Sequence, residues 1–479
     1  MAGITFELQK LAKAPSILGG LSAYGHSAVI VAGPWLFTVL AIAFITIATE
    51  QYLGLDALAN FRIVLIYGFA ISLVTTAPVV IVTTRMLSDM IFAQVYTAVS
   101  QLLFTSLVAG TLIAVLCAFP IFTVVFPLDP SMLPGALFCV AITAMIWIAL
   151  VFCGAIKDFL AITLGFLIGL VLGIFLGLQA TKAGYGTHGL LWSFNLGLSL
   201  TVFILLSRIL VTFPTAMDSG LSSIRMLLSA SRSHVILAVG ATLAVTGIWI
   251  DKWVMWTSSS GERLPVGLIH APFYDSAMFV ANLAIIPGLA AFVLHLETGF
   301  YRHFKIFNHN IETHATLNNI KSAAANLQRA TINTLMQIVL LQAIVCAIAI
   351  WLSPAIADSL NLQFRQIGVL RIGFLGVLFH FAFLASSSLL LFMNQSLKYF
   401  KLQAIFLLLN GVLTYAAVML GPDFWGYGYM VGAMISSLLA VQSLYQELSR
   451  LPYTMFTMAA TRSAENDWLM PLLKDRNKS

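Results

Sequence analysis

Twelve apolar runs, each near bilayer length, fill this chain almost from end to end. Hydrophobic residues make up 60% of its 479 residues and charged residues only 9%, whereas an ordinary soluble domain has about a quarter of its residues charged. A run of about 20 apolar residues matches the hydrocarbon thickness of a bilayer. In lipid such a run must be helical, because a helix satisfies its own backbone polar groups. The sequence therefore predicts an all-α, polytopic membrane protein with about 12 transmembrane helices.

A longer polar connection at residues 213–233 separates the runs into two sets of six. This arrangement predicts two six-helix lobes, residues 1–232 with the linker and residues 233–479 with a polar tail. The expected spans are residues 24–48, 61–83, 101–126, 133–153, 159–179, 188–212, 234–257, 273–296, 331–353, 368–393, 402–420 and 426–446.

The basic residues predict how the spans are oriented. If the N-terminus is cytoplasmic, 18 of the 24 Lys and Arg residues fall in segments on the cytoplasmic side. Such a bias is the positive-inside pattern of membrane proteins. It favours an even number of spans and places both termini in the cytoplasm.

Charged and aromatic residues gather near the end of the seventh run. Four residues there share a helix face by their spacing: Trp249, Lys252, Trp253 and Trp256. Asp251 is expected to point toward a different neighbour, while Tyr274 and Asp275 enter the next span on the same side of the membrane. One interpretation is an interfacial aromatic belt with a snorkelling lysine. The other is a polar passage in which indole faces stack on sugar rings. Asp275 beside Lys252 or Arg263 would instead form a structural ion pair.

Prolines mark spans that can bend. Pro34 lies in the first run, Pro78 in the second, and Pro287 precedes Gly288 in the eighth. A proline removes one backbone hydrogen bond and kinks a helix. These positions are candidate hinges, or fixed kinks that only help packing.

Residues 298–330 form a polar, basic segment without proline. Apolar residues spaced by four, three and four predict an amphipathic helix, and they are Phe300, Phe304, Phe307 and Ile311. This helix could lie on the inner leaflet. Alternatively, its apolar residues could dock a cytoplasmic partner.

Signatures of enzymes and cofactor sites are missing from the sequence. It has no Walker-type loop, no Gly-x-Ser-x-Gly and no His-Glu-x-x-His motif. The four cysteines lie in apolar runs without metal-ligand spacing. We therefore expect no catalytic residues, no metal and no cofactor. Energy for transport would have to come from a gradient, a partner or synthesis of the substrate.

Several blocks of sequence resemble the PelG-like family, the membrane components of Pel exopolysaccharide systems. The blocks are Met1 to Leu8, Ser27 to Trp35, Trp249 to Trp253, Tyr274 to Phe279, and Ile286 to Ala290 running on to Thr298. Members of this family are similar to polysaccharide transporters of the MATE-like (MOP) flippase superfamily, whose two six-helix lobes surround a central cavity.

The resemblance implies an exporter in the bacterial inner membrane for the Pel polymer, a cationic polysaccharide rich in N-acetylgalactosamine and galactosamine. It also implies partners, namely the cytoplasmic glycosyltransferase PelF and the membrane proteins PelD and PelE. Two rival hypotheses stay open. One is a cation-coupled multidrug transporter or lipid-linked oligosaccharide flippase of the same fold, and the other is a scaffold that anchors the glycosyltransferase. The first rival predicts acidic residues deep in a lobe, and the sequence places almost none there.

Overall fold

The computed structural model describes residues 17–214, 220–296 and 300–453. Within these ranges, twelve helical stretches are long and apolar enough to cross a membrane. The structure confirms the all-α, polytopic architecture. One pair of two-residue strands is the single sheet among the described residues.

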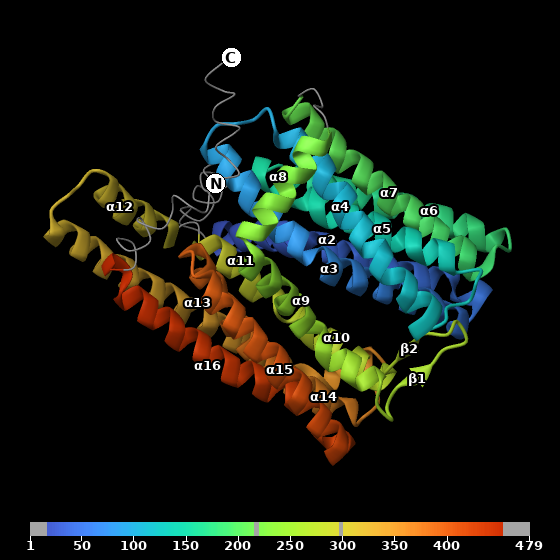
Figure 1. Ribbon diagram of the computed structural model, residues 1–479. Helices are drawn as coiled ribbons and strands as arrows, with labels where there is room; N and C mark the ends of the chain where they lie inside the picture. Colours follow the sequence, from blue (N-terminus) through green and yellow to red (C-terminus); the bar gives the residue numbers. More distant parts are fainter. Residues whose placement is uncertain (1–16, 215–219, 297–299, 454–479) are drawn as a thin grey trace. The chain divides into compact units, whose positions relative to one another are not determined.

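The first half of the chain is almost entirely helical (Figure 1). Its elements are α2 (Ile17–Leu53), α3 (Leu55–Phe92), α4 (Val99–Pro120), η1 (Ile121–Val125), α5 (Leu133–Ile156), α6 (Phe159–Lys182), α7 (Gly186–Thr212) and α8 (Gly220–Ser233).

The second half adds shorter helices to the long ones. Its elements are α9 (Val235–Trp256), β1 (Glu262–Arg263), β2 (Ile269–His270), α10 (Pro272–Leu283), α11 (Ile286–His295), α12 (Tyr301–Glu312), α13 (Leu317–Ser359), α14 (Gln366–Phe392), α15 (Ser396–Leu420), η3 (Pro422–Phe424) and α16 (Tyr427–Ser449).

The described chain divides into two compact units. The N-terminal unit contains residues 33–245 and also residues 262–270. The C-terminal unit contains residues 246–261 and 271–453, with the first part of α2. These units cut α9 and assign the β-hairpin to the N-terminal unit, which the sequence did not anticipate. The division at 232/233 stays a prediction about lobe boundaries.

Small residues bring α6 and α7 close together in the N-terminal unit. Glycines recur every fourth residue along α6 at positions 165, 169, 173 and 177. A Cβ added at Gly173 would lie 3.5 Å from the Phe194 Cα of α7, so the two backbones nearly touch. Without hydrophobic driving force between helices in lipid, such close packing is a main source of helix association.

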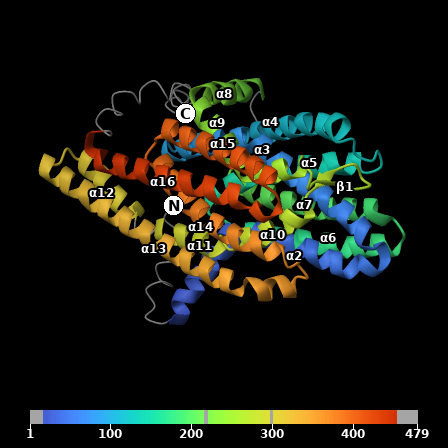
Figure 2. The same cartoon turned by 90° about the horizontal axis from the view of Figure 1, so that it is seen from below.

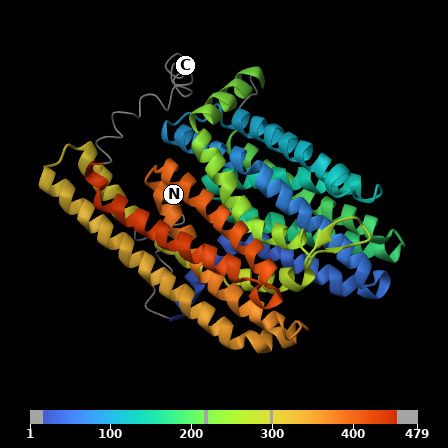
Figure 3. The same ribbon diagram turned by 60° about the horizontal axis from the view of Figure 1, so that its bottom comes forward.

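The β-hairpin of residues 262–270 is seated on the N-terminal unit. The Tyr67 hydroxyl of α3 donates to the Ile269 carbonyl at 2.8 Å, and the Asp129 amide donates to the Val266 carbonyl at 3.0 Å. Leu268 is completely buried. Gly267 has φ +98°, and a Cβ there would strike the Pro127 carbonyl, so this turn requires glycine. The hairpin appears as yellow-green arrows in Figures 1 and 3.

In the C-terminal unit, α13, α14, α15 and α16 form the main bundle (Figure 2). Gly428 of α16 lies against the backbone of Thr414 in α15, and Gly376 of α14 lies against the Tyr429 ring. The bundle buries aromatic side chains such as Phe381 and Phe406. α10 packs on α14, and α11 packs on α13.

Two features differ from the sequence expectation in extent. Helices α3 and α13 have 38 and 43 residues, so they continue well beyond the apolar runs at 61–83 and 331–353. The connection expected as a polar linker contains the helix α8.

Candidate functional site

α9 places a carboxylate and an ammonium on consecutive residues near its C-terminal end. The Asp251 side chain is 0% exposed and that of Lys252 is 14% exposed. Lys252 Nζ donates to the Asp251 oxygens Oδ1 and Oδ2 at 3.1 and 2.9 Å, and to the Ile248 carbonyl at 3.1 Å. Successive helical residues diverge by about 100°, but the flexible lysine side chain bends back across that angle. Asp251 therefore contacts the adjacent Lys252 in addition to a side chain of another helix, Tyr274.

Three further side chains complete a connected polar cluster in the C-terminal unit. The buried Tyr274 hydroxyl of α10 donates to Asp251 Oδ2 at 2.8 Å. Lys252 Nζ lies 5.9 Å from the centroid of the Tyr429 ring in α16, within the usual cation–π range. The Tyr429 hydroxyl is hydrogen-bonded to His380 Nδ1 of α14 at 2.7 Å. We call these five residues of α9, α10, α14 and α16 the polar cluster.

Asp275 lies beside the polar cluster with partners of its own. The Trp256 indole N–H donates to Asp275 Oδ2 at 2.7 Å, and the Ala271 amide donates to the same oxygen at 3.0 Å. Within the described part of the chain, Asp275 Oδ1 is buried and has no hydrogen-bond partner. Lys252 forms its ion pair with Asp251 rather than with Asp275.

The three tryptophans of α9 have different surroundings. Trp256 is only 5% exposed and its ring meets that of Trp249 edge to face, with centroids 6.5 Å apart. Trp249 and Trp253 are half-buried. An aromatic belt requires indoles at the lipid–water boundary, which does not describe the buried Trp256.

Sequence reasoning missed His380 and Tyr429 as members of the cluster. Both lie inside long apolar runs, where a neutral histidine and a tyrosine do not stand out as charges do. Their partners come from helices distant in sequence, 49 residues apart for the pair itself. The usable signal was a titratable or hydroxyl-bearing ring in the middle of a mostly apolar run.

Pro287 breaks the eighth span into α10 and α11, whereas Pro34 and Pro78 lie inside continuous helices. The Gln342 amide of α13 donates to the Ala284 carbonyl at 2.8 Å, at the break itself. Gly288 leaves room for this contact, since a Cβ there would strike Gln342. A side-chain partner at a broken helix is how membrane proteins satisfy freed backbone groups.

The predicted amphipathic helix forms as α12, but much of its apolar face is already covered. Phe307 is 0% and Phe300 3% exposed, and α12 packs along α13. The Phe300 ring stacks on Phe304 at 5.5 Å and meets the Phe392 ring at 6.2 Å. Phe300 and Phe307 are therefore not available to a partner, and docking through this segment stays a prediction for its remaining surface. Residues 298 and 299 lie outside the described residues.

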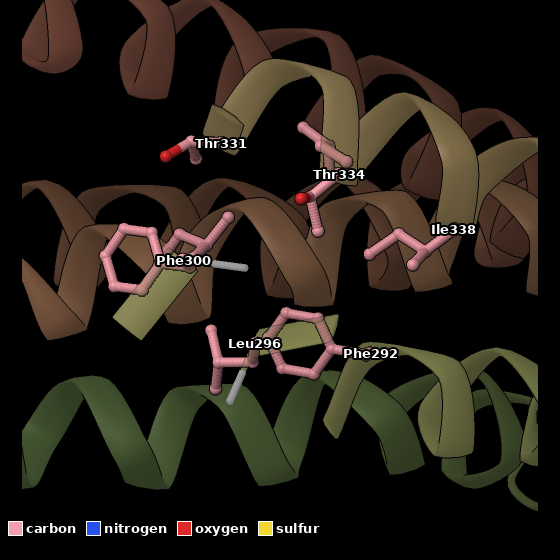
Figure 4. A pocket seen from close by; sticks show the side chains of 8 residues that line it. Phe292, Leu296, Phe300, Thr331, Thr334 and Ile338 are labelled. Atoms are coloured by element: carbon pink, nitrogen blue, oxygen red, sulfur yellow. The ribbon is translucent and has the colours of Figure 1, made fainter. Parts of the chain in front are cut away.

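A small apolar hollow lies where this segment meets the bundle (Figure 4). Its cavity volume is only about 10 Å³, so it has room for at most about one water molecule. Its lining residues come from α11, α13, α14 and the start of α12: Phe292, Leu296, Phe300, Thr331, Thr334, Leu335, Ile338 and Leu389. Thr331 directs its hydroxyl to its own helix, at the Leu327 carbonyl, so this hollow lacks the chemistry to bind a polar ligand.

Solved structures with the same architecture are MATE transporters. A MATE transporter in the bent conformation has a TM-score of 0.60 and 14% identity, over 90% of this chain and 97% of that chain. A mutant of the Vibrio cholerae MATE transporter VcmN gives 0.60 and 14%, over 90% and 98%. An outward-facing multidrug-resistance MATE transporter of the MOP superfamily gives 0.55 and 15%, over 89% and 96%. The fold is that of a MATE-like membrane transporter.

The sequence profile of the PelG family, described as "Putative exopolysaccharide Exporter (EPS-E)", matches residues 1–456. The chain belongs to the PelG family. A search of curated proteins gave no match.

Proposed function

We propose that this protein exports Pel exopolysaccharide from the cytoplasm across the bacterial inner membrane to the periplasm, and thereby supports the biofilm matrix. The observation that carries the proposal is the family match over residues 1–456. The MATE-like fold supports it, because that architecture serves transport.

The route of the polymer is proposed to pass the polar cluster. The half-buried indoles of Trp249 and Trp253 offer flat faces to sugar rings. The carboxylates of Asp251 and Asp275 would offset the positive charge of galactosamine units. In this hypothesis Lys252 keeps Asp251 neutralised until a sugar amine replaces the lysine ammonium.

Export is proposed to be coupled to synthesis. PelF would extend the polymer on the cytoplasmic side, while PelD and PelE would hold the synthase at the membrane. The bias of 18 in 24 basic residues supports cytoplasmic termini. The exposed remainder of α12 is then on the synthase side.

The test is polymer transfer into sealed, inverted membrane vesicles that contain this protein and its synthase partners. We expect Trp253→Ala and Asp251→Asn each to reduce the rate of polymer transfer into the vesicles by more than about tenfold. A tenfold change in rate corresponds to about 1.4 kcal/mol of activation free energy. Matched controls are Trp351→Ala and Asp358→Asn, because Trp351 is 78% exposed on α13 and Asp358 is also exposed.

Two results would contradict the proposed route or the proposed transport. Equal transfer by the cluster variants and their controls would remove the polar cluster from the route. Normal transfer by vesicles that lack this protein would rule out export by it and favour a scaffold role.

A second candidate function is cation-coupled transport on the same fold, and one observation favours it. The sequence placed almost no acid deep in a lobe, but Asp251 is fully buried in the C-terminal unit. The charged and titratable groups facing it are Lys252, Tyr274, Asp275, His380 and Tyr429. If transfer stops when a proton or sodium gradient is collapsed while synthesis continues, coupling to that cation is supported. If transfer persists, synthesis supplies the drive.

A further inference from the structure

Helix α8 lies in the stretch that the sequence presents as a linker between the two sets of spans. Its 14 residues extend about 21 Å, too short for the roughly 30 Å hydrocarbon core. It packs on α3 and α4 within the N-terminal unit and runs across the beginning of α4 rather than along it (Figures 1 and 3). A helix placed across the ends of spans lies at the level of the membrane surface.

One face of α8 is buried and another leaves large apolar side chains exposed. Leu227 is 7% and Ala230 0% exposed. On an adjoining face, Ile224 is 49% and Leu228 56% exposed. The buried pair accounts for packing on the N-terminal unit, so the exposed pair is available to another apolar environment.

Two arginines accompany this exposed apolar pair. Arg225 and Arg232 are both exposed, and with Ile224 and Leu228 they fall within about 100° of the helix circumference. Residues 220–233 contain no Asp or Glu. A short helix with apolar and basic residues on its outer face and no acid has the composition of an interfacial anchor.

The neighbouring chain places this face where lipid begins. α3 ends at Phe92 and α4 starts at Val99, and both helices are membrane spans. Phe92, the last residue of α3, is 91% exposed, and Tyr96 in the turn between the helices is 47% exposed. Exposed aromatic residues at the ends of spans mark the boundary between hydrocarbon and headgroups.

We propose that α8 is an in-plane membrane anchor that binds anionic phospholipid headgroups. Ile224 and Leu228 enter the acyl boundary, while the guanidinium groups of Arg225 and Arg232 bind the lipid phosphates. Arginine suits this role because its planar fork donates two parallel hydrogen bonds to one phosphate. The proposal does not depend on the exported substrate.

The test measures the depth of α8 with spin labels in nanodiscs of phosphatidylglycerol with phosphatidylcholine, or of phosphatidylcholine alone. The background is Cys117→Ser, which removes the exposed one of the four cysteines. Labels are placed by Leu228→Cys, by Ser233→Cys, and by Lys321→Cys as a control on an exposed part of α13. Collision with oxygen reports lipid, and collision with a water-soluble nickel complex reports water.

The anchor predicts high oxygen and low nickel access at residue 228, more nickel access at 233 and full nickel access at 321. With Arg225→Gln and Arg232→Gln together, the affinity of α8 for phosphatidylglycerol should fall roughly thirtyfold. A higher fraction of this lipid is then needed to protect residue 228 from the nickel complex. High nickel access at 228 in both lipids would overturn the proposal. Low access of both reagents to residue 228 would overturn the proposal, because it would show that protein rather than lipid covers α8. Equal protection of residue 228 in both lipid compositions would show that the arginines do not bind anionic headgroups.

Discussion

Lys252 and Asp251 show how one residue can determine the role of the next. A buried carboxylate without a partner is costly, and the neighbouring lysine removes that cost by turning back on its own helix. Buried pairs of this kind contribute little net stability, but breaking one is expensive because a charge is left behind. Replacing either residue alone is therefore expected to be more destabilising than replacing both.

This coupling is testable by a double-mutant cycle. Lys252→Met should lower the free energy of unfolding by about 3–5 kcal/mol, since the Asp251 carboxylate is left buried without its counter-ion. Lys252→Met combined with Asp251→Asn should recover most of that loss, because no charge remains and Tyr274 keeps a hydrogen-bond acceptor. Denaturant unfolding of the purified protein gives all the values. Equal losses for the single and double variants would show that the two side chains do not depend on each other.

At the scale of elements, the break between α10 and α11 is held by a neighbour. Gln342 satisfies the Ala284 carbonyl across 58 residues of sequence. The break is thus a property of two helices together, and Pro287 alone does not define it. Pro34 and Pro78 show that a proline alone does not break a helix here, since both lie in helices that continue past them.

Replacing Gln342 should loosen this break. Gln342→Leu leaves the Ala284 carbonyl without that donor, and we expect a loss of about 1–2 kcal/mol of unfolding free energy. Hydrogen exchange at residues 284–288 should become faster than in the wild type. The control is Gln337→Leu, an exposed position on the same helix. The same exchange rates in both variants would remove Gln342 from this role.

The β-hairpin should respond to pH. Burial lowers the pKa of His270 from its ordinary 6.5. Two nearby charges have smaller effects: Glu262 raises this pKa and Arg62 lowers it. The folded hairpin therefore holds this proton more weakly than the unfolded chain does. Its stabilising contribution is present above the ordinary pKa and is lost as pH falls through that value toward the lowered one.

We expect residues 262–270 to exchange amide hydrogen faster at about pH 5.5 than at about pH 7.5, after correction for the intrinsic rate. His270→Gln should remove this difference, because glutamine does not titrate. Persistence of the difference in that variant would assign it to another group.

At the scale of the whole molecule, the orientation can be checked with two cysteines. In the Cys117→Ser background, Ser322→Cys on α13 should react with an impermeant maleimide only from the cytoplasmic side. Ser259→Cys, in the turn before β1, should react only from the periplasmic side. Both positions are exposed. Labelling of both from the same side would contradict the positive-inside assignment.

Much of the fold was predictable because lipid leaves few choices. An apolar run of bilayer length must become a helix, so all twelve spans were expected. The polar flanks were harder, since Asn326 and Arg329 carry no signal that tells a continuing α13 from a loop. α8 was missed because its 14 residues are too few and too polar to look like a span.

The candidate site was predictable in composition but not in connection. The sequence gathered Asp251, Lys252 and Tyr274 into one region, yet the bonds among them depend on side-chain torsions that spacing does not fix. His380 and Tyr429 meet because α14 packs against α16, where Gly376 leaves room for the Tyr429 ring. Those contacts are set by the tertiary structure.

The attachment of the β-hairpin to the N-terminal unit also has a consequence for biosynthesis. The N-terminal unit takes residues 262–270 from beyond α9, so the ribosome must deliver a seventh span before this unit can be completed. A nascent chain that ends at residue 245 leaves the Tyr67 hydroxyl and the Asp129 amide without the carbonyls that receive them. Insertion of the first six spans and completion of their unit are therefore separate events in time.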